Sequence, residues 1–169
     1  MTLQELRVLL DYHYWARDRV LAAVEPLPHD QFTRDMGSSF RSIRDTLAHL
    51  YFAEWAWYSR WQGNSPDAQL PADMFPDLPA IRVLWRDHET EMRSFLETLG
   101  EEGINRRFEY KMLNGRPGAS VFWHMLQHVV NHGSYHRGQI TTMLRQLGAA
   151  PPKGMDLIGF YRERGQRET

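Results

Sequence analysis

The chain has 169 residues, no cysteine and eight histidines, and its 20 Lys and Arg nearly balance its 21 Asp and Glu. Without cysteine there are no disulfides, thiolate zinc sites, iron–sulfur clusters or cysteine nucleophile. A formal charge of −1 argues against a nucleic-acid-binding surface, which normally carries a basic excess. The length predicts one domain over residues 1–169. Histidine is therefore the residue type whose chemistry needs explaining.

The first residues of the chain carry no targeting signal. Residues 1–5 lack the basic start and apolar run of a signal peptide, and no apolar stretch approaches the 18 residues of a membrane span. We therefore expect a soluble, cytoplasmic protein that does not contact a membrane.

Apolar residues recur at three- and four-residue steps in the first third of the chain, which is typical of helices. One helix is predicted over 3–24, and the proline at Pro26 stops it. A second helix is predicted to begin at Ser38 or Ser39, its candidate N-cap residues, and one side of it runs from Ile43 to Trp61.

The second half of the chain predicts two further helices with a different segment between them. The third helix covers about 77–99 and stops at Gly100. Residues 108–118 alternate in polarity and contain Asn114-Gly115, which predicts a short extended segment or hairpin. The fourth helix runs from about 120 to 147.

Four amphipathic segments without a strong series of strands predict an all-α fold, a four-helix bundle. A proline-containing loop joins the second and third helices, and it is long enough to cross the bundle. Simple up-and-down topology is therefore not assumed.

Four histidines stand four residues apart in the fourth helix, at His124, His128, His132 and His136. Each step offsets neighbouring side chains by about 40°, so adjacent pairs share a face but all four cannot point at one atom. A His-x3-His pair on a helix is an ordinary metal-chelating arrangement. The Glu that follows the first His in metalloproteases is absent here, which disfavours a protease. Spacing alone does not choose among the three pairs.

A complete site needs a third ligand, and His49 is the best candidate because it lies on an otherwise apolar helical face. Facing helices of a bundle build metal sites in this way. Three neutral imidazoles with a fourth position open suit hydrolytic or Lewis-acid chemistry. The alternative is that His49 is a hydrogen-bonded histidine of the core.

Two sequence motifs resemble those of the DinB/YfiT-like family of metal-dependent proteins. Residues 131–139 read Asn-His-Gly-Ser-Tyr-His-Arg-Gly-Gln, and residues 42–50 read Ser-Ile-Arg-Asp-Thr-Leu-Ala-His-Leu. Residues 12–16 and 155–158 agree with the family as well, so the resemblance spans nearly the whole chain.

The resemblance implies a four-helix bundle, often a homodimer, with a divalent metal held by three histidines. Carried over residue by residue, these are His49, His132 and His136. The chain departs from the family at Arg17, where relatives often have Asn. Arg17 is therefore either a pocket residue that changes the charge of the site or a solvated surface residue.

Several residues are candidates for supporting the ligands or lining a pocket. Metal-bound imidazoles usually donate their second N–H to a carboxylate or carbonyl, a role open to Asp45 and Gln139. His128 lies one turn before His132 and is a candidate neighbour of the metal. Gly133 and Gly138 lie inside a helix, where close packing or room for a ligand would explain them.

The remaining histidines have ordinary explanations. His124 is expected on the surface or at an interface, His13 and His88 in the core or on the surface, and His29 in a turn. Glu54 follows His49 by five residues, about 140° around the helix, and is poorly aimed at the same metal. No general base is evident, and no catalytic residue is assigned.

These features favour a metal-dependent enzyme that acts on a small molecule, as a hydrolase or, by resemblance, as a thiol-dependent transferase. Zinc or nickel suits three imidazoles best, with iron and manganese as further options. A low-molecular-weight thiol would have to arrive with the substrate, because the chain has no cysteine. The alternatives are a non-catalytic metal-binding or stress-response module and a bundle with vestigial histidines.

Metal binding by imidazoles is expected to depend on pH. Because a histidine must be neutral to bind a metal, affinity should fall as the pH drops through about 6.5.

Overall fold

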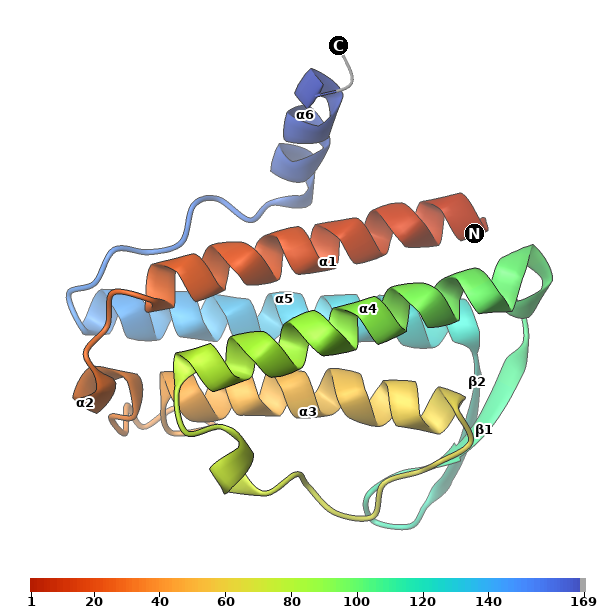
Figure 1. The fold of residues 1–169 in the computed structure, drawn as a ribbon, viewed down its shortest axis with the longest axis horizontal. Helices are drawn as coiled ribbons and strands as arrows, with labels where there is room; N and C mark the ends of the chain where they lie inside the picture. Colours follow the sequence, from red (N-terminus) through yellow and green to blue (C-terminus); the bar gives the residue numbers. More distant parts are fainter. Residues whose placement is uncertain (168–169) are drawn as a thin grey trace.

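A computed structural model describes residues 1–167, and four long helices packed side by side dominate it (Figure 1). The all-α bundle predicted from the sequence is confirmed. The four helices are α1 (Leu3–Val24), α3 (Ile43–Trp61), α4 (Leu78–Gly103) and α5 (Phe122–Gln146). The shorter elements are α2 (His29–Phe32), the 3-10 helix η1 (Ala72–Met74), β1 (Arg107–Lys111), β2 (Pro117–Val121) and α6 (Leu157–Arg167).

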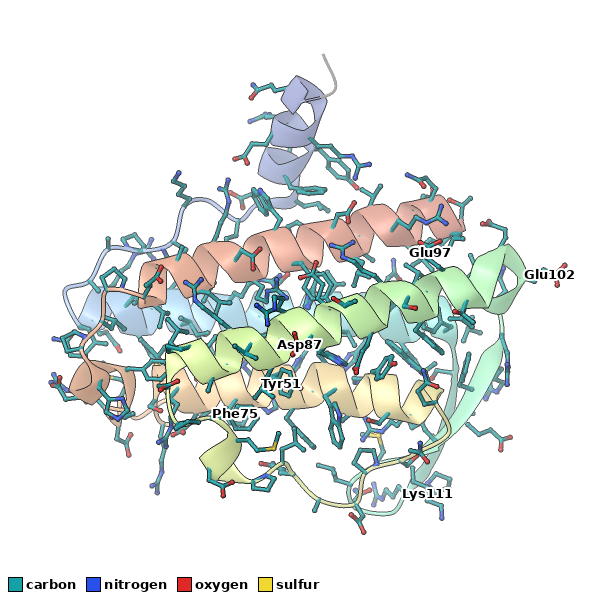
Figure 2. All side chains as sticks on the ribbon, viewed as in Figure 1. Tyr51, Phe75, Asp87, Glu97, Glu102 and Lys111 are labelled. Carbon is teal, nitrogen blue, oxygen red and sulfur yellow. The ribbon has the colours of Figure 1, made fainter. Side chains whose placement is uncertain are left out.

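The connection between α3 and α4 is a crossover. Figure 1 shows α3 and α4 running in one direction and α1 and α5 in the other. Residues 62–77 therefore carry the chain back along the bundle. Phe75 fixes this connection by packing against Tyr51 of α3, with ring centroids 5.7 Å apart (Figure 2). Around the bundle, α5 contacts α1 and α3, and α4 contacts the same two helices from the other side.

The start of α3 differs from the sequence prediction, because Ser42 is the N-cap in place of Ser38 or Ser39. The Ser42 hydroxyl accepts a hydrogen bond from the backbone N–H of Asp45 at 3.0 Å. Ser38 instead pairs with Arg41 in a tight turn, where Arg41 adopts a φ of 57°. The N-cap therefore lies three residues beyond Ser39 and four beyond Ser38.

The predicted hairpin is present. Strands β1 and β2 pair antiparallel, with Arg107 opposite Val121 and Lys111 opposite Pro117. Gly115 has a φ of 77°, a conformation that favours glycine and explains the Asn-Gly sequence of the turn.

Helix α6 is absent from the sequence prediction. It follows the Pro151-Pro152 segment and packs on α1 through Phe160, whose ring lies 5.8 Å from Tyr12 and 5.5 Å from Trp15. No helix within residues 1–167 combines the length and the apolar character that crossing a membrane requires.

A single buried carboxylate, that of Glu54, ties three helices together. Its side chain on α3 is 1% exposed, and it accepts hydrogen bonds from His13 Nε2 (2.9 Å) and the Tyr14 hydroxyl (2.6 Å) of α1. The indole N–H of Trp85 on α4 donates to it at 2.9 Å. Burial alone would raise the pKa of Glu54, but His13, His88 and the Tyr14 hydroxyl outweigh it and bring the pKa to about 2. Glu54 is therefore ionised inside the core.

Glu54→Gln is expected to destabilise the fold by about 3 kcal/mol, because it removes the charge that three buried donors share. Urea denaturation measures the change. Glu97→Gln is the matched control, since Glu97 is exposed and pairs with Arg7 at the surface, and we expect no measurable loss there. Equal effects for the two variants would contradict the role given to Glu54.

Candidate metal site

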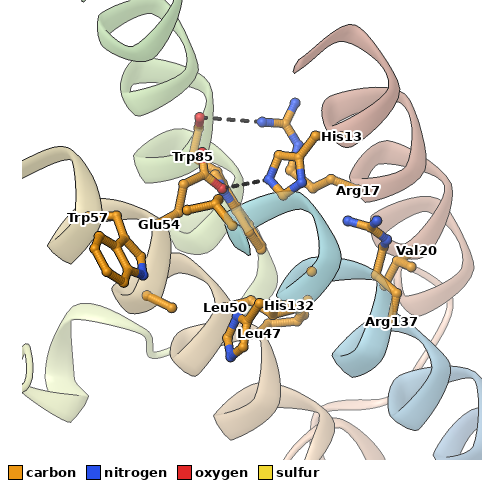
Figure 3. Close-up of a pocket in the computed structure, with 13 residues that line it drawn as sticks. His13, Arg17, Val20, Leu47, Leu50, Glu54, Trp57, Trp85, His132 and Arg137 are labelled. Carbon is orange, nitrogen blue, oxygen red and sulfur yellow. Dashed lines mark hydrogen bonds and ion pairs between the residues drawn. The ribbon is translucent and has the colours of Figure 1, made fainter. Parts of the chain in front are cut away.

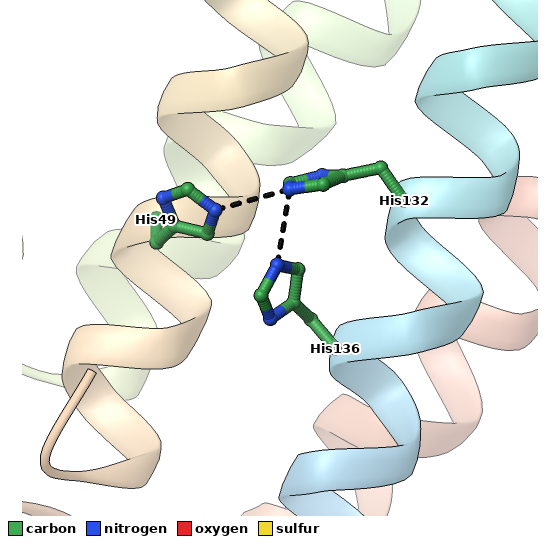
Figure 4. A group of neighbouring side chains, drawn as sticks. All are labelled: His49, His132 and His136. Carbon is green, nitrogen blue, oxygen red and sulfur yellow. Dashed lines mark hydrogen bonds between the residues drawn. The ribbon is translucent and has the colours of Figure 1, made fainter. Parts of the chain in front are cut away.

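Three histidines from two helices converge on one point. His49 lies on α3, and His132 and His136 lie one turn apart on α5 (Figure 4). His132 Nε2 is 3.1 Å from His49 Nε2 and 3.0 Å from His136 Nε2. One nitrogen of each ring lies within 4.8 Å of the others. The structure thus brings together the three residues that the family resemblance pointed to.

This arrangement fits a metal ion. Two nitrogens bound to a tetrahedral zinc at 2.0–2.1 Å would be about 3.3 Å apart, close to the observed separations. His136 Nδ1 donates to Gln139 Oε1 at 2.7 Å, which leaves the lone pair of His136 Nε2 directed at the other two rings. The supporting role predicted for Gln139 therefore has a matching contact in the structure. The cluster could hold a metal ion.

Phe40 covers the cluster, and sequence reasoning missed it. Its ring stacks on His49 with centroids 3.8 Å apart and planes 15° apart, and it meets the His136 ring at an angle of 68°, with centroids 5.3 Å apart. Phe40 stands in the irregular turn before α3, outside every periodic pattern. Its neighbour Arg41, with positive φ, sets the local backbone that aims it at the histidines.

The environment keeps two of the imidazoles neutral. Burial, reinforced by the charge of His136, lowers the pKa of His49 to about 4. Burial, reinforced chiefly by His136 and His49, lowers the pKa of His132 to about 3. Both side chains therefore present a free lone pair at neutral pH, as a metal ligand must.

On its inner side, the cluster adjoins a small cavity between α1, α3, α4 and α5 (Figure 3). We call this the inner cavity; His13, Arg17, Glu54, His132 and Arg137 are among its lining residues. Arg17 is 8% exposed and pairs with Asp18 and Glu89, so the interpretation as a solvated residue is wrong and the pocket interpretation fits.

The other candidates for supporting the ligands, His128 and Asp45, differ in their distance from the cluster and in their contacts. The His128 ring lies 5.9 Å from that of His132 and 5.4 Å from Trp57, beside the cluster but outside its converging nitrogens. The carboxylate of Asp45 accepts a hydrogen bond from Arg44 Nε at 2.9 Å. Among the contacts within residues 1–167, that pairing takes the place of the anticipated bond to His49.

The histidines outside the cluster lie where ordinary roles place them. His124 and His29 are exposed. His13 and His88 are buried in the core beside Glu54, with nitrogens 2.9 Å and 3.9 Å from its carboxylate. Glu54 points toward this group, which agrees with its poor aim at the metal ligands.

The two helical glycines of α5 differ in their surroundings. A Cβ on Gly133 would lie 2.8 Å from Arg137 Nη1 and 2.9 Å from His13 Cε1, so α1 and α5 approach closely beside His132. A Cβ on Gly138 would meet no atom within 4 Å. Close packing explains Gly133, and nothing in the structure explains Gly138.

Gly133→Ala and Gly138→Ala should therefore change stability in opposite directions. We expect the first to cost about 1–3 kcal/mol through overpacking against His13 and Arg137. The second should stabilise the helix by about 0.5–1 kcal/mol, because Ala is the better helix former. Thermal and urea unfolding of the pair provide the measurement, and a stabilising Gly133→Ala would contradict the close approach.

Comparison with known proteins agrees with the fold. The DinB family model matches residues 1–168. Protein DinB of Bacillus subtilis (strain 168) is 28% identical over 149 residues, covering 84% of this chain and 86% of that protein. The uncharacterized protein YizA of the same organism is 23% identical over 145 residues, covering 83% and 87%. The crystal structure of a DinB-like protein from Bacillus cereus ATCC 10987 matches with a TM-score of 0.61 at 19% identity, over 86% and 95% of the two chains. The chain belongs to the DinB family.

Proposed function

We propose that His49, His132 and His136 hold a divalent metal ion and that the protein is a metal-dependent enzyme acting on a small molecule. The proposal rests on the convergence of three Nε2 atoms, because His132 Nε2 lies about 3 Å from both His49 Nε2 and His136 Nε2. Gln139 holds His136 in the tautomer that a metal ligand requires. Without a cation, the three imidazole nitrogens face one another, and each nitrogen that carries no proton directs its lone pair at a neighbouring ring. A bound metal ion would accept all three lone pairs at once.

The ligand set favours particular ions. Imidazole nitrogens suit zinc, nickel, copper and iron, and we propose zinc or nickel first, with iron or manganese as further options. Three protein ligands leave a coordination position for water or substrate, so a bound ion would supply Lewis-acid polarisation or an activated nucleophile.

The residues of the chain hold and shield this centre. Phe40 excludes water from the faces of His49 and His136, and Gln139 orients His136. Glu54 is fully engaged with His13, Tyr14 and Trp85, so it is not available as a general base. This favours a reaction in which the substrate brings its own nucleophile, such as a low-molecular-weight thiol, over one that needs a protein base. Hydrolysis is the second candidate.

Stoichiometric metal binding tests the first part of the proposal. Isothermal titration of the metal-free, untagged protein with Zn²⁺ and Ni²⁺ should show one site per chain. His132→Ala should abolish it, and Gln139→Leu should weaken it by about 10- to 100-fold. His124→Ala is the control, because His124 lies exposed on the same helix and should leave affinity unchanged.

The same variants test catalysis. With metal bound, turnover in a screen of thiol-transfer and hydrolysis substrates should disappear in His49→Ala and persist in His124→Ala. Metal binding without any turnover would leave a non-catalytic binding module. Absence of stoichiometric metal would end the proposal altogether.

The pH dependence of affinity should reflect the lowered pKa values of His49 and His132. At His49 and His132, protons compete with the metal only near pH 4 and 3, so the loss of zinc affinity through these two ligands should extend well below pH 6.5. Competition titrations from pH 8 to 4.5 measure it. Phe40→Ala exposes His49 and should move the loss to higher pH. A loss complete by pH 6.5 in the unaltered protein would show that burial does not control the site.

A further inference from the structure

Arg60 is a buried cation without an acidic partner. The residue is 5% exposed, and no carboxylate oxygen within residues 1–167 lies within 4.0 Å of it. Its Nε donates to the carbonyl of Lys111 at 3.1 Å, and its guanidinium lies over the ring of Trp57, 4.7 Å from the centroid. These contacts leave both terminal nitrogens without a hydrogen bond among the described residues. The terminal nitrogens are not among the fully buried unpaired polar atoms of residues 1–167, so they remain accessible to an anion although the rest of the side chain is buried.

Arg60 lines a groove that also reaches the metal ligands. The groove has a volume of about 300 Å³. It follows α3, where His49, Ala53 and Arg60 lie on the same stripe; His49 and Arg60 are about 16 Å apart along the helix at 1.5 Å per residue. We call it the outer groove; its walls also include Phe52, Ala56, Trp57, Met112, Leu113, Asn114, His128 and His132.

We propose that the outer groove binds an elongated organic anion whose anionic group pairs with Arg60 and whose other end reaches the histidine cluster. The contact with a metal at that end rests on the proposed function, whereas the pairing with Arg60 does not. The middle of the ligand packs on the apolar wall. The proposed substrate class is therefore a small molecule with an apolar body and a carboxylate or similar anion at one end.

The wall of the groove supports an apolar middle section. Phe52 and Trp57 supply aromatic surface from α3. Met112 and Leu113, at the hairpin turn, are 42% and 38% exposed and supply further apolar surface that a ligand could cover. Ala53 and Ala56 of α3 also line the groove, and their short side chains leave space in it.

The charge pattern orients the ligand. Among the described residues that line the groove there is one Arg, Arg60, and no Lys, Asp or Glu. Arg60 lies at the end of the groove away from His49, so it sets where the anionic group binds.

Octanoate and octanamide test the proposal in the unaltered protein, because they differ in charge and little in shape. Binding is followed by isothermal titration, and by tryptophan fluorescence since Trp57 lines the groove. We expect octanoate to bind at least tenfold more tightly, both in protein stripped with EDTA and in protein loaded with Zn²⁺. Equal affinities would overturn the proposal. So would a preference for octanoate seen only with zinc, because the carboxylate would then be binding the metal.

Substitutions in the outer groove test where the anionic group of octanoate binds. Arg60→Met should reduce octanoate affinity at least tenfold and leave octanamide unaffected, and Arg60→Lys should retain part of the preference. Leu113→Asp adds a negative charge to the groove wall and should weaken octanoate selectively. Val83→Asp is its matched control, since Val83 is 48% exposed on α4, outside the groove.

The outcomes separate the two proposals. If Arg60→Met does not fold, Leu113→Asp and the two probes still decide. Identical behaviour of Leu113→Asp and Val83→Asp would place octanoate elsewhere and overturn the inference. If the unaltered protein binds no zinc but still prefers octanoate to octanamide, the proposed metal site is rejected and the proposed anion site stands.

Discussion

The hydrogen bonds to the buried carboxylate of Glu54 set the geometry on which the rest of the structure depends. An ionised group in a core requires donors on every side, and here α1 and α4 supply them to α3. The contact continues beyond α1, because the His13 ring that donates to Glu54 also lies against Gly133 of α5. Gly133 adjoins His132. The position of His132 relative to α3 is thus tied to Glu54 through one imidazole and one glycine.

The two sides of the histidine cluster are unlike each other. The inner cavity is crowded by Arg17, Arg137 and the Glu54 group, and its free volume of about 10 Å³ holds no more than about one water. The outer groove is roughly thirty times larger and mostly apolar. The outer groove, and not the inner cavity, therefore has room beside the cluster for the proposed ligand.

Sequence periodicity and motifs predicted the four long helices, the hairpin and the three converging histidines, because each leaves a local pattern in the sequence. The features that the sequence did not predict depend on tertiary contacts. Phe40 lies in a turn whose backbone is set by a residue with positive φ, and the first turn of α3 begins later than serine composition suggests. No local pattern marks Arg60 as buried, and its burial depends on packing against Trp57. For Arg17 the sequence left the pocket and the surface both open, and packing on Tyr14 decides between them.

The spacing between the proposed metal ligands and the proposed anion partner depends on one helix and one hydrogen bond. His49 and Arg60 share α3, which fixes the distance between their backbones, and the hydrogen bond from Arg60 Nε to the Lys111 carbonyl of β1 holds the guanidinium. His132 and His136 are fixed in the same way by α5. The hairpin turn that carries Met112 and Leu113 supplies the remaining wall, and its strands are held in register independently of the histidines. Substitutions in that turn can therefore alter which apolar body fits the groove while the ligands of the metal and the partner of the anion stay in place.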